Sequence, residues 1–363
     1  MVEWKTIDEI SSSVFAGGTP STKHDEYYDG DIPWIRSGEI DFNVITSAER
    51  NITEAGYNNS SAKLIRKGSV VMAMTGATVA KSAIVDFETS ANQSVCAIET
   101  KESVANYKYV YYSLAKDYFR IKSSAQGALT SLNLAMIKQI RIPIPSLSEQ
   151  TRIVGILDTF TASIENLKEQ IAERRKQYEH YRDQLLDLEG KEGVEMKTLG
   201  DICKLERGVR VVKKDLQEEG SIPVYQNSLI PLGYYDRSNY PPNTSFVICA
   251  GAASEVGFSD KAFWAADDCT CIVCSPLVKS KFVYYFLMVK QFMLKAQVRK
   301  ASVPRLSKDV IGKLSFPLTS VEKQSRIVSI LDTFEASIAN LEAQLKEREK
   351  QYEFYRNKLL TFE

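Results

Sequence analysis

One segment of 41 residues occurs twice in this chain of 363 residues. Residues 149–189 and 323–363 align without a gap at an offset of 174, and 26 of the 41 positions are identical. A repeat of this length that is seen twice predicts a molecule with internal pseudo-two-fold symmetry. The fold must therefore accommodate two copies of one element.

Apolar residues recur within each copy at alternating steps of three and four, which is the a/d spacing of a coiled coil. No glycine or proline interrupts either copy after Gly155, so each copy is expected to be one long helix. Capping boxes at 146–149 and 319–322 are expected to start the two helices. The predicted seam consists of Leu157, Phe160, Ile164, Leu167, Ile171, Arg174 and Tyr178 in the first copy, and of Leu331, Phe334, Ile338, Leu341, Leu345, Arg348 and Tyr352 in the second.

We expect the two helices to pair with each other in antiparallel orientation, because they belong to one chain and a whole globular segment separates them. The charged seam positions, Arg174 and Arg348, are interpreted as polar residues that fix the register. Two separate solvated helices and a homodimeric zipper remain as alternatives.

The chain alternates between globular segments and helices. Strand-like runs near residues 70–74, 83–85 and 94–98 and a helix near 106–123 indicate a mixed first segment. The second segment restarts the first, because residues 196–202 match 4–10, 246–252 echo 71–77, and 306–317 match 132–143. The predicted fold class is α+β, with two globular α/β domains separated by a long antiparallel two-helix coiled coil. The predicted limits are 1–145, 146–189 (first helix), 190–195 (linker), 196–317 and 318–363 (second helix).

Charge and composition narrow the functional classes. The net charge is zero, yet residues 196–317 hold 17 Lys and Arg against 11 Asp and Glu, whereas residues 1–145 hold 15 against 16. The second segment is therefore basic, which is a hint of nucleic-acid binding. The sequence begins without an apolar signal region and contains no apolar run long enough for a membrane span. Six cysteines without a regular framework favour a reducing cytoplasm.

Sites for chemistry are not apparent in the sequence. Residues 239–243 have the wrong order for an adenine methyltransferase motif, and residues 76–81 lack the glycine spacing of a phosphate-binding loop. Gly17, Gly18 and Gly76 are interpreted as turn glycines. The cysteines at 269, 271 and 274 do not have a standard zinc spacing, so we interpret them as core thiols, with Cys96 at the position of Cys271. No catalytic residue and no metal site is predicted.

Taken together, the chain resembles the specificity subunits of type I restriction–modification systems. The resemblance covers nearly the whole length and rests on residues 18–20 with 28–34, residues 74–78 with Asn92 and Gln93, residues 142–150, and residues 222–225 with 233–235. It implies that each globular segment is a target recognition domain that reads one half of a split double-stranded DNA sequence. It also implies that the helices set the unread gap and bind two modification subunits, which restriction subunits join. S-adenosylmethionine, Mg and ATP are then expected on those partners, and no cofactor on this chain.

Contacts with DNA require Arg and Lys for phosphates, and Arg, Asn, Gln, Ser and Thr for base edges. In the first segment the predicted contacts are Thr19, Ser21, Lys23, Arg36, Ser37, Thr78, Lys81, Gln126, Thr130 and Ser131. In the second they are Arg207, Arg210, Lys213, Lys214, Tyr225, Asn227, Arg237, Arg299, Lys300 and Arg305. The alternatives to a DNA-reading scaffold are a structural interaction protein, whose coiled coil joins two modules that do not bind nucleic acid, and an enzyme that acts alone.

Overall fold

The computed structural model describes residues 2–125, 131–212, 214 and 216–362. The chain divides into two compact units, one formed by residues 1–167 with 344–363 and the other by residues 168–343. The boundary between the units falls inside both long helices rather than at the predicted segment limits. Each unit therefore contains one globular part and a portion of each helix. None of the helices in the described ranges is long and apolar enough to cross a lipid bilayer.

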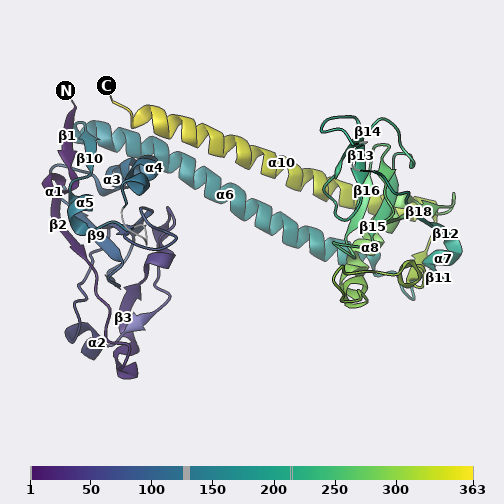
Figure 1. The fold of residues 1–363 in the computed structure, drawn as a ribbon, viewed down its shortest axis with the longest axis horizontal. Coiled ribbons are helices and arrows are strands. Elements are labelled where there is room, and N and C mark those ends of the chain that lie inside the picture. The colour runs from purple at the N-terminus through teal and green to yellow at the C-terminus, as the bar shows by residue number, and fades with distance from the viewer. Residues whose placement is uncertain (1, 126–130, 213, 215, 363) are drawn as a thin grey trace. The chain divides into compact units, whose positions relative to one another are not determined.

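The first unit is built on a five-stranded sheet of order β2-β9-β6-β7-β4, beside a three-stranded sheet β5-β3-β8 and the pair β1-β10 (Figure 1). Its elements are β1 (Glu3–Thr6), α1 (Ile7–Ile10), β2 (Ser11–Ala16), η1 (Asp25–Tyr27), β3 (Tyr28–Ile35), η2 (Ser37–Glu39), β4 (Val44–Ile45), β5 (Asn51–Ile52), α2 (Glu54–Asn58), β6 (Val70–Ala73), β7 (Ser82–Val85), β8 (Ser90–Ala91), β9 (Val95–Thr100), α3 (Tyr107–Lys116), α4 (Tyr118–Ser123), α5 (Leu134–Lys138), β10 (Arg141–Ile144) and the first part of α6 (Leu147–Leu186).

The second unit repeats this plan with a four-stranded sheet of order β12-β18-β15-β16, a three-stranded sheet β14-β13-β17 and the pair β11-β19. Its elements are the remainder of α6, β11 (Glu195–Thr198), α7 (Leu199–Ile202), β12 (Cys203–Arg207), β13 (Ile222–Tyr225), β14 (Gly233–Tyr235), β15 (Thr244–Ile248), β16 (Val256–Ser259), β17 (Trp264–Ala265), β18 (Cys269–Cys274), α8 (Ser280–Ala296), α9 (Lys308–Gly312), β19 (Ser315–Leu318) and the first part of α10 (Val321–Leu359).

Equivalent strand pairs confirm the predicted internal repeat. Trp4 lies opposite Pro143 in β1-β10, and Met196 lies opposite Pro317 in β11-β19. In the first unit the amide of Leu132 donates to the carbonyl of Met74, at 2.8 Å. In the second unit the amide of Leu306 donates to the carbonyl of Cys249 at the same distance. The two globular parts therefore share one scaffold.

Three local expectations need correction. The helix expected over 106–123 breaks at Asp117 into α3 and α4. The second capping hydrogen bond is shifted by one residue, because the amide of Lys323 donates to Ser320 Oγ at 3.2 Å. Cys96 corresponds to Thr270 rather than Cys271, since Cys96 pairs with Ala16 at the end of β2 and Thr270 pairs with Arg207 at the end of β12. The cysteines are free and lie in or beside the core, where burial raises the pKa of the Cys96 thiol to about 12.

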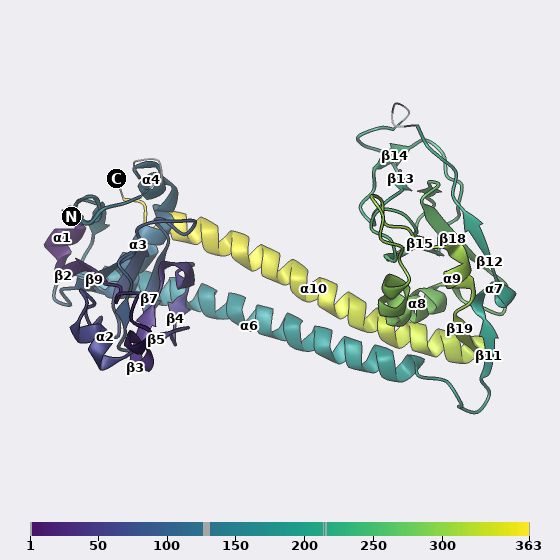
Figure 2. The same cartoon turned by 60° about the horizontal axis from the view of Figure 1, so that its bottom comes forward.

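The long helices pair antiparallel within each unit, as predicted (Figures 1 and 2). In the first unit the rings of Phe160 in α6 and Tyr355 in α10 stack at 5.4 Å, and the Arg348 guanidinium lies 5.7 Å from the Phe160 ring centre. The second unit repeats the arrangement with Phe334 and Tyr181 at 5.4 Å, and with Arg174 over Phe334 at 5.9 Å. Every predicted seam residue is buried or partly buried. The two arginines thus lie against aromatic faces of the opposing helix.

Two repeated polar contacts fix α3 and α8 on the long helices. Gln150 is fully buried, and its Oε1 accepts from the Asn106 amide at 2.8 Å at the start of α3. Gln324, also fully buried, accepts from the Lys279 amide at 2.9 Å at the start of α8.

About two helical turns further along each long helix, aspartates complete this attachment. Asp158 accepts from the Tyr112 hydroxyl at 2.7 Å and pairs with Lys108 at 2.6 Å. Asp332 accepts from the Tyr285 hydroxyl at 2.6 Å and pairs with Lys281 at 2.9 Å. These contacts explain why the repeated segments share Gln and Asp at positions outside the predicted seam.

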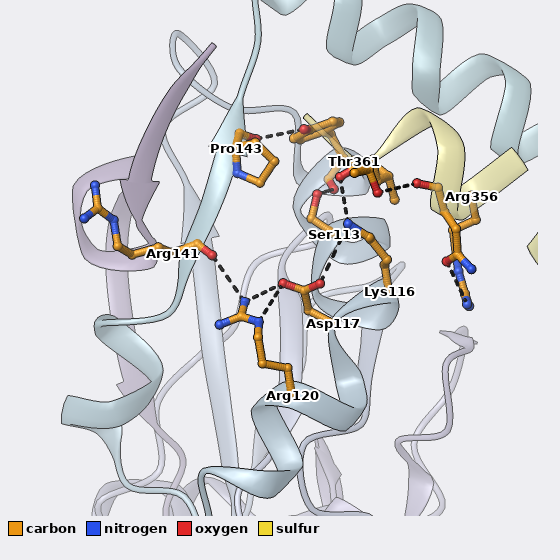
Figure 3. Close-up of polar contacts among 11 residues, drawn as sticks. Ser113, Lys116, Asp117, Arg120, Arg141, Pro143, Arg356 and Thr361 are labelled. Atoms are coloured by element: carbon orange, nitrogen blue, oxygen red, sulfur yellow. Dashed lines mark hydrogen bonds and ion pairs between the residues drawn. The ribbon is translucent and has the colours of Figure 1, made fainter. Parts of the chain in front are cut away.

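The end of α10 packs on the first globular part (Figure 3). Lys116, in the last turn of α3, donates to the carbonyl of Leu360 at 3.0 Å, and Leu360 is buried in the core of this unit. The next residue, Asp117, pairs with Arg120, which also donates to the carbonyl of Arg141 at 3.4 Å. The C-terminal turn of α10 therefore belongs to the core that the N-terminal strands build.

A tryptophan holds the segment after β2 and after β12, but from different strands. Trp34 in β3 donates its indole N–H to the carbonyl of Gly18 at 3.0 Å. Trp264 in β17 donates to the carbonyl of Val209 at 2.8 Å. Gly18 and Val209 are equivalent, because their amides donate to the carbonyls of Ala91 in β8 and Ala265 in β17, which are paired with Ile35 and Tyr225. Each unit thus has the same indole–carbonyl hydrogen bond. The tryptophan comes from the first strand of the pair in one unit (β3 of β3-β8) and from the second strand in the other (β17 of β13-β17).

Candidate nucleic-acid interface

Four predicted residues of the first unit come together between η2 and the β6-β7 turn. The Thr78 hydroxyl donates to the carbonyl of Ser37 at 2.7 Å. Arg36 pairs with Glu49 at 2.5 Å, and Lys81 pairs with Asp41 at 2.5 Å. Both cations at this position are therefore already neutralised by carboxylates of the same unit.

The segment after β2 lies close to the backbone of another loop. A Cβ added to Gly17 would lie 2.2 Å from the carbonyl oxygen of Ala91, so only glycine fits there. Gly17 and Gly18 are thus required by close backbone approach, whereas Gly76, with φ of +81°, is a turn glycine as predicted. Beyond them the Thr19 hydroxyl contacts the Gln93 side chain, and Ser21 and Lys23 are exposed.

The predicted residues at the end of the first globular part are only partly covered by the described ranges. Gln126 and Thr130 lie outside them. Ser131 is partly buried and directly precedes Leu132, whose amide bond to Met74 was noted above.

The matching position of the second unit carries a basic hairpin, which comprises residues 299–305. The amide of Arg299 donates to the carbonyl of Arg305 at 2.9 Å, and the amide of Arg305 donates back at 3.2 Å. Arg305 also bridges to Ala250, and the amide of Gly251 donates to the carbonyl of Pro304 at 3.2 Å. Lys300 stands at the exposed turn. Three predicted residues therefore share one rigidly attached loop.

Arg207, at the end of β12, approaches this hairpin. Its guanidinium donates to the carbonyl of Asp267 at 2.6 Å. Arg207 and Arg305 line one hollow of about 450 Å³, together with Thr270 and Lys308. Asp267, Asp268 and Asp309 line the same hollow, so it offers both hydrogen-bond donors and acceptors.

The other predicted residues of the second unit have mixed surroundings. Arg210, Lys214 and Asn227 are exposed, and Lys213 lies outside the described ranges. The Tyr225 ring packs against the rings of Phe246 and Phe263, with centres 4.9 Å and 5.7 Å away, and burial raises its pKa. The Arg237 guanidinium lies over the Tyr235 ring at 5.0 Å and donates to its hydroxyl. Tyr225 and Arg237 thus contribute to packing as well as to the surface.

Comparison with known proteins identifies the family. The family model described as "Type I restriction modification DNA specificity domain" matches residues 1–174 and 191–350. The chain belongs to this family. The two matched regions correspond to the two copies of the internal repeat, so this chain holds the specificity domain twice.

Relatives that carry the name of specificity subunit match the chain over most of its length. A type I restriction enzyme specificity subunit of Haemophilus influenzae is 28% identical and covers 99% of this chain and 96% of its own. The EcoprrI specificity subunit of Escherichia coli is 28% identical and covers 92% and 88%. The EcoR124I/EcoR124II specificity subunit of Escherichia coli is 36% identical, over 51% of this chain and 48% of its own.

Solved structures agree on the fold. The crystal structure of a type I restriction–modification S subunit from M. genitalium superposes with a TM-score of 0.72 at 18% identity, and covers 100% of this chain and 97% of that one. A chain from a study of complex assembly and conformational transition of the type I system superposes with a TM-score of 0.64. The antiparallel helix pair and the two mixed α/β globular parts are therefore the specificity-subunit fold.

One repeated surface feature of this specificity subunit was not predicted. Phe119 in α4 is 81% exposed, and Phe292 in α8 is 84% exposed. They occupy equivalent positions, since each is followed two residues later by a buried residue, Ile121 or Leu294, and three residues later by a lysine. The only sequence signal for them is the short match between residues 119–122 and 292–295, which share Phe at the first position and Lys at the last.

Among the residues that the structure describes, no group of three or more His, Cys, Asp or Glu side chains is arranged to hold a metal ion. The sequence predicts no catalytic residue, and the family model that matches describes a DNA specificity domain.

Proposed function

We propose that this chain reads a bipartite double-stranded DNA sequence and serves as the scaffold for the other subunits of a type I restriction–modification complex. The observation that supports this most directly is one scaffold built twice with different loops. Leu132 and Leu306 make the same anchoring hydrogen bond, yet the residues before them differ in charge and length of side chain. Two modules of one fold with different surface loops suit two different half-sites.

The helices set the gap between the half-sites in this proposal. α6 is one unbroken helix of 40 residues and α10 one of 39. At a rise of about 1.5 Å per residue each is roughly 60 Å long. Because each long helix contributes residues to both units, we expect the number of its residues to limit the length of DNA accepted between the two half-sites.

The test is to map methylated bases in DNA from cells that carry this chain and its modification subunit. We expect two short sequences at a fixed separation. Insertion of one heptad into both helices is expected to lengthen or abolish the accepted gap, while loop variants leave the gap unchanged. One contiguous site, or an unaltered gap after the insertion, would contradict the proposal. Methyl transfer by the purified chain alone would favour an enzyme that acts independently.

We further propose that two modification subunits bind equivalently, one at each unit. Phe119 with Lys122 and Phe292 with Lys295 support this, because large exposed aromatic side chains are typical of protein interfaces and here occur at equivalent positions. S-adenosylmethionine, Mg and ATP would then be bound by the partner subunits.

Single and double substitutions test this stoichiometry. Phe119→Ala is expected to weaken one of two binding events in calorimetry or native mass spectrometry, and Phe119→Ala with Phe292→Ala both of them. Ile230→Ala, at an apolar side chain that is 78% exposed in the loop between β13 and β14, serves as the control. Unchanged assembly in the double variant would show that these side chains are not part of the interface.

A further inference from the structure

The hairpin of residues 299–305 places two like charges directly opposite each other. Arg299 and Arg305 exchange both backbone hydrogen bonds, at 2.9 and 3.2 Å, which defines a directly paired position of an antiparallel ladder. Side chains at such a position project to the same face, and like charges there are destabilising. The arrangement is therefore unfavourable unless something negative lies between the two guanidinium groups.

Carboxylates lie near the hairpin, since Asp267, Asp268 and Asp309 line the hollow beside Arg305, but they form no ion pair with it in the described ranges. Within the described ranges, none of the ion pairs includes Arg299, Lys300 or Arg305. The first unit differs, because Arg36 and Lys81 are each paired with a carboxylate at 2.5 Å. The positive charge of the hairpin thus remains available to an external anion.

The first unit has the same scaffold at this place without the charge. Leu132 and Leu306 share their backbone anchor, so Ser131 is the counterpart of Arg305. By the same alignment Ala16, opposite Cys96, is the counterpart of Arg207, opposite Thr270. In sequence, residues 123–134 contain no charged side chain. The basic group is therefore a property of the second unit alone.

From this geometry we infer that Arg299 and Arg305 together hold a phosphate of the DNA backbone, with Lys300 beside them, and that the second unit supplies most of the salt-dependent affinity. The first unit then contributes mainly hydrogen bonds from neutral side chains. This inference rests on the proposed function, since it assigns unequal tasks to the two DNA-reading units. A phosphate between the guanidinium groups removes their repulsion and gains charge-assisted hydrogen bonds.

The experiment measures the dissociation constant of the full chain, with its modification subunit, for its DNA target at several salt concentrations. Each phosphate contact contributes about 0.9 to the slope of the logarithm of the binding constant against that of salt concentration. A triple variant, Arg299→Gln with Lys300→Gln and Arg305→Gln, is expected to lower the slope by about 0.9 for the phosphate shared by the two arginines and by up to about 0.9 more for Lys300. The order of preference among DNA sequences is expected to stay the same.

A matched control removes the same charge elsewhere. Lys5, Lys67 and Lys197 are paired with Glu3, Asp86 and Glu195, so their replacement by Gln changes the net charge equally without touching the hairpin. The slope is expected to change by less than about 0.5. A second variant, Arg299→Lys with Arg305→Lys, retains the charge and is expected to retain the slope, because a phosphate accepts either cation.

The outcomes separate this inference from the proposed function. Absence of any DNA binding by the unsubstituted complex would reject the proposed function itself. Binding with an unchanged slope in the triple variant, or an equal loss in the control, would overturn the inference alone. A changed preference at one base in the Arg→Lys variant would also overturn it, since that result indicates base reading by the guanidinium fork. Thermal melting without DNA verifies folding, and the triple variant is expected to melt no lower than the parent.

Discussion

The buried glutamine at the start of each long helix allows a quantitative prediction. Gln150 Nε2 donates to the carbonyls of Val104 and Pro145, at 3.1 and 2.9 Å, and its Oε1 accepts from the Asn106 amide. Leucine at this position has a similar size but leaves the buried carbonyl of Pro145, and the partly buried N–H of Asn106 and carbonyl of Val104, without these partners. Each buried group left unsatisfied costs about 1–3 kcal/mol. Because carbonyls tolerate a lost partner better than amides, we expect Gln150→Leu to lower the free energy of unfolding by about 3–5 kcal/mol.

The repeat supplies an internal replicate. Gln324 makes the same three bonds, to Lys279, Leu277 and Thr319, so Gln324→Leu is expected to cost a similar amount. Urea unfolding gives the free energy, and hydrogen exchange gives the location. The Asn106 amide should lose protection in the first variant only, and the Lys279 amide in the second only.

A surface glutamine on the same helix is the control. Gln177 bonds Glu173 one turn away in α6, so Gln177→Leu is expected to change stability by no more than about 0.5 kcal/mol. A loss below about 1 kcal/mol in both buried variants, or unchanged exchange at both amides, would refute the reasoning. The glutamines would then not attach α3 and α8 to the long helices.

Three further predictions concern the close approach of Gly208 to a neighbouring backbone, the arginines of the coiled-coil seam, and the pH dependence of stability. A Cβ at Gly208 would lie 2.2 Å from the Ala266 carbonyl oxygen, so Gly208→Ala is expected to destabilise by about 1–3 kcal/mol or more in urea, whereas Gly155→Ala, in open space on α6, should stabilise by about 0.5–1 kcal/mol. Arg174→Leu with Arg348→Leu is expected to raise the melting temperature and loosen the register detected by disulfide trapping between α6 and α10; no change in either measurement would contradict the assigned role. Burial raises the pKa of Tyr112 and Tyr285 above the ordinary value of about 10, so the stability contributed by their neutral forms is complete below about pH 10 and lost as pH rises further. Urea titrations from neutral pH upward should show this fall, and it should be shallower in Tyr112→Phe with Tyr285→Phe.

The features that the sequence predicted correctly are those with a local cause. Heptad spacing located both long helices, and a run of β-branched residues located β6 and β9. The break at Asp117 escaped prediction because residues 106–123 have no glycine or proline to signal it. At the break, Asp117 pairs with Arg120, which also donates to the carbonyl of Arg141 in β10, a contact between residues that the local sequence does not signal.

The candidate DNA-contact residues could be selected from the sequence by residue type but not by their surroundings in the fold. Arg36 and Arg299 are both arginines in loops, yet one is paired with Glu49 and the other faces Arg305. That difference arises from contacts between residues far apart in sequence, or from a register that only the folded hairpin defines. Residue type therefore indicates the arginines of the hairpin, but their direct pairing is visible only in the folded structure.

The different strand positions of Trp34 and Trp264 limit which hybrids of the two globular parts can form the indole–carbonyl hydrogen bond. Trp34 lies opposite Ser90, and Val224 lies opposite Trp264, at equivalent positions of the two strand pairs. A hybrid that combines β3 with β17 would contain both Trp34 and Trp264, and the two indoles would compete for one backbone carbonyl. The reciprocal hybrid, which combines β13 with β8, would contain Val224 and Ser90 and would leave that carbonyl without an indole donor. Crossovers that preserve this hydrogen bond must therefore fall outside the segments from β3 to β8 and from β13 to β17.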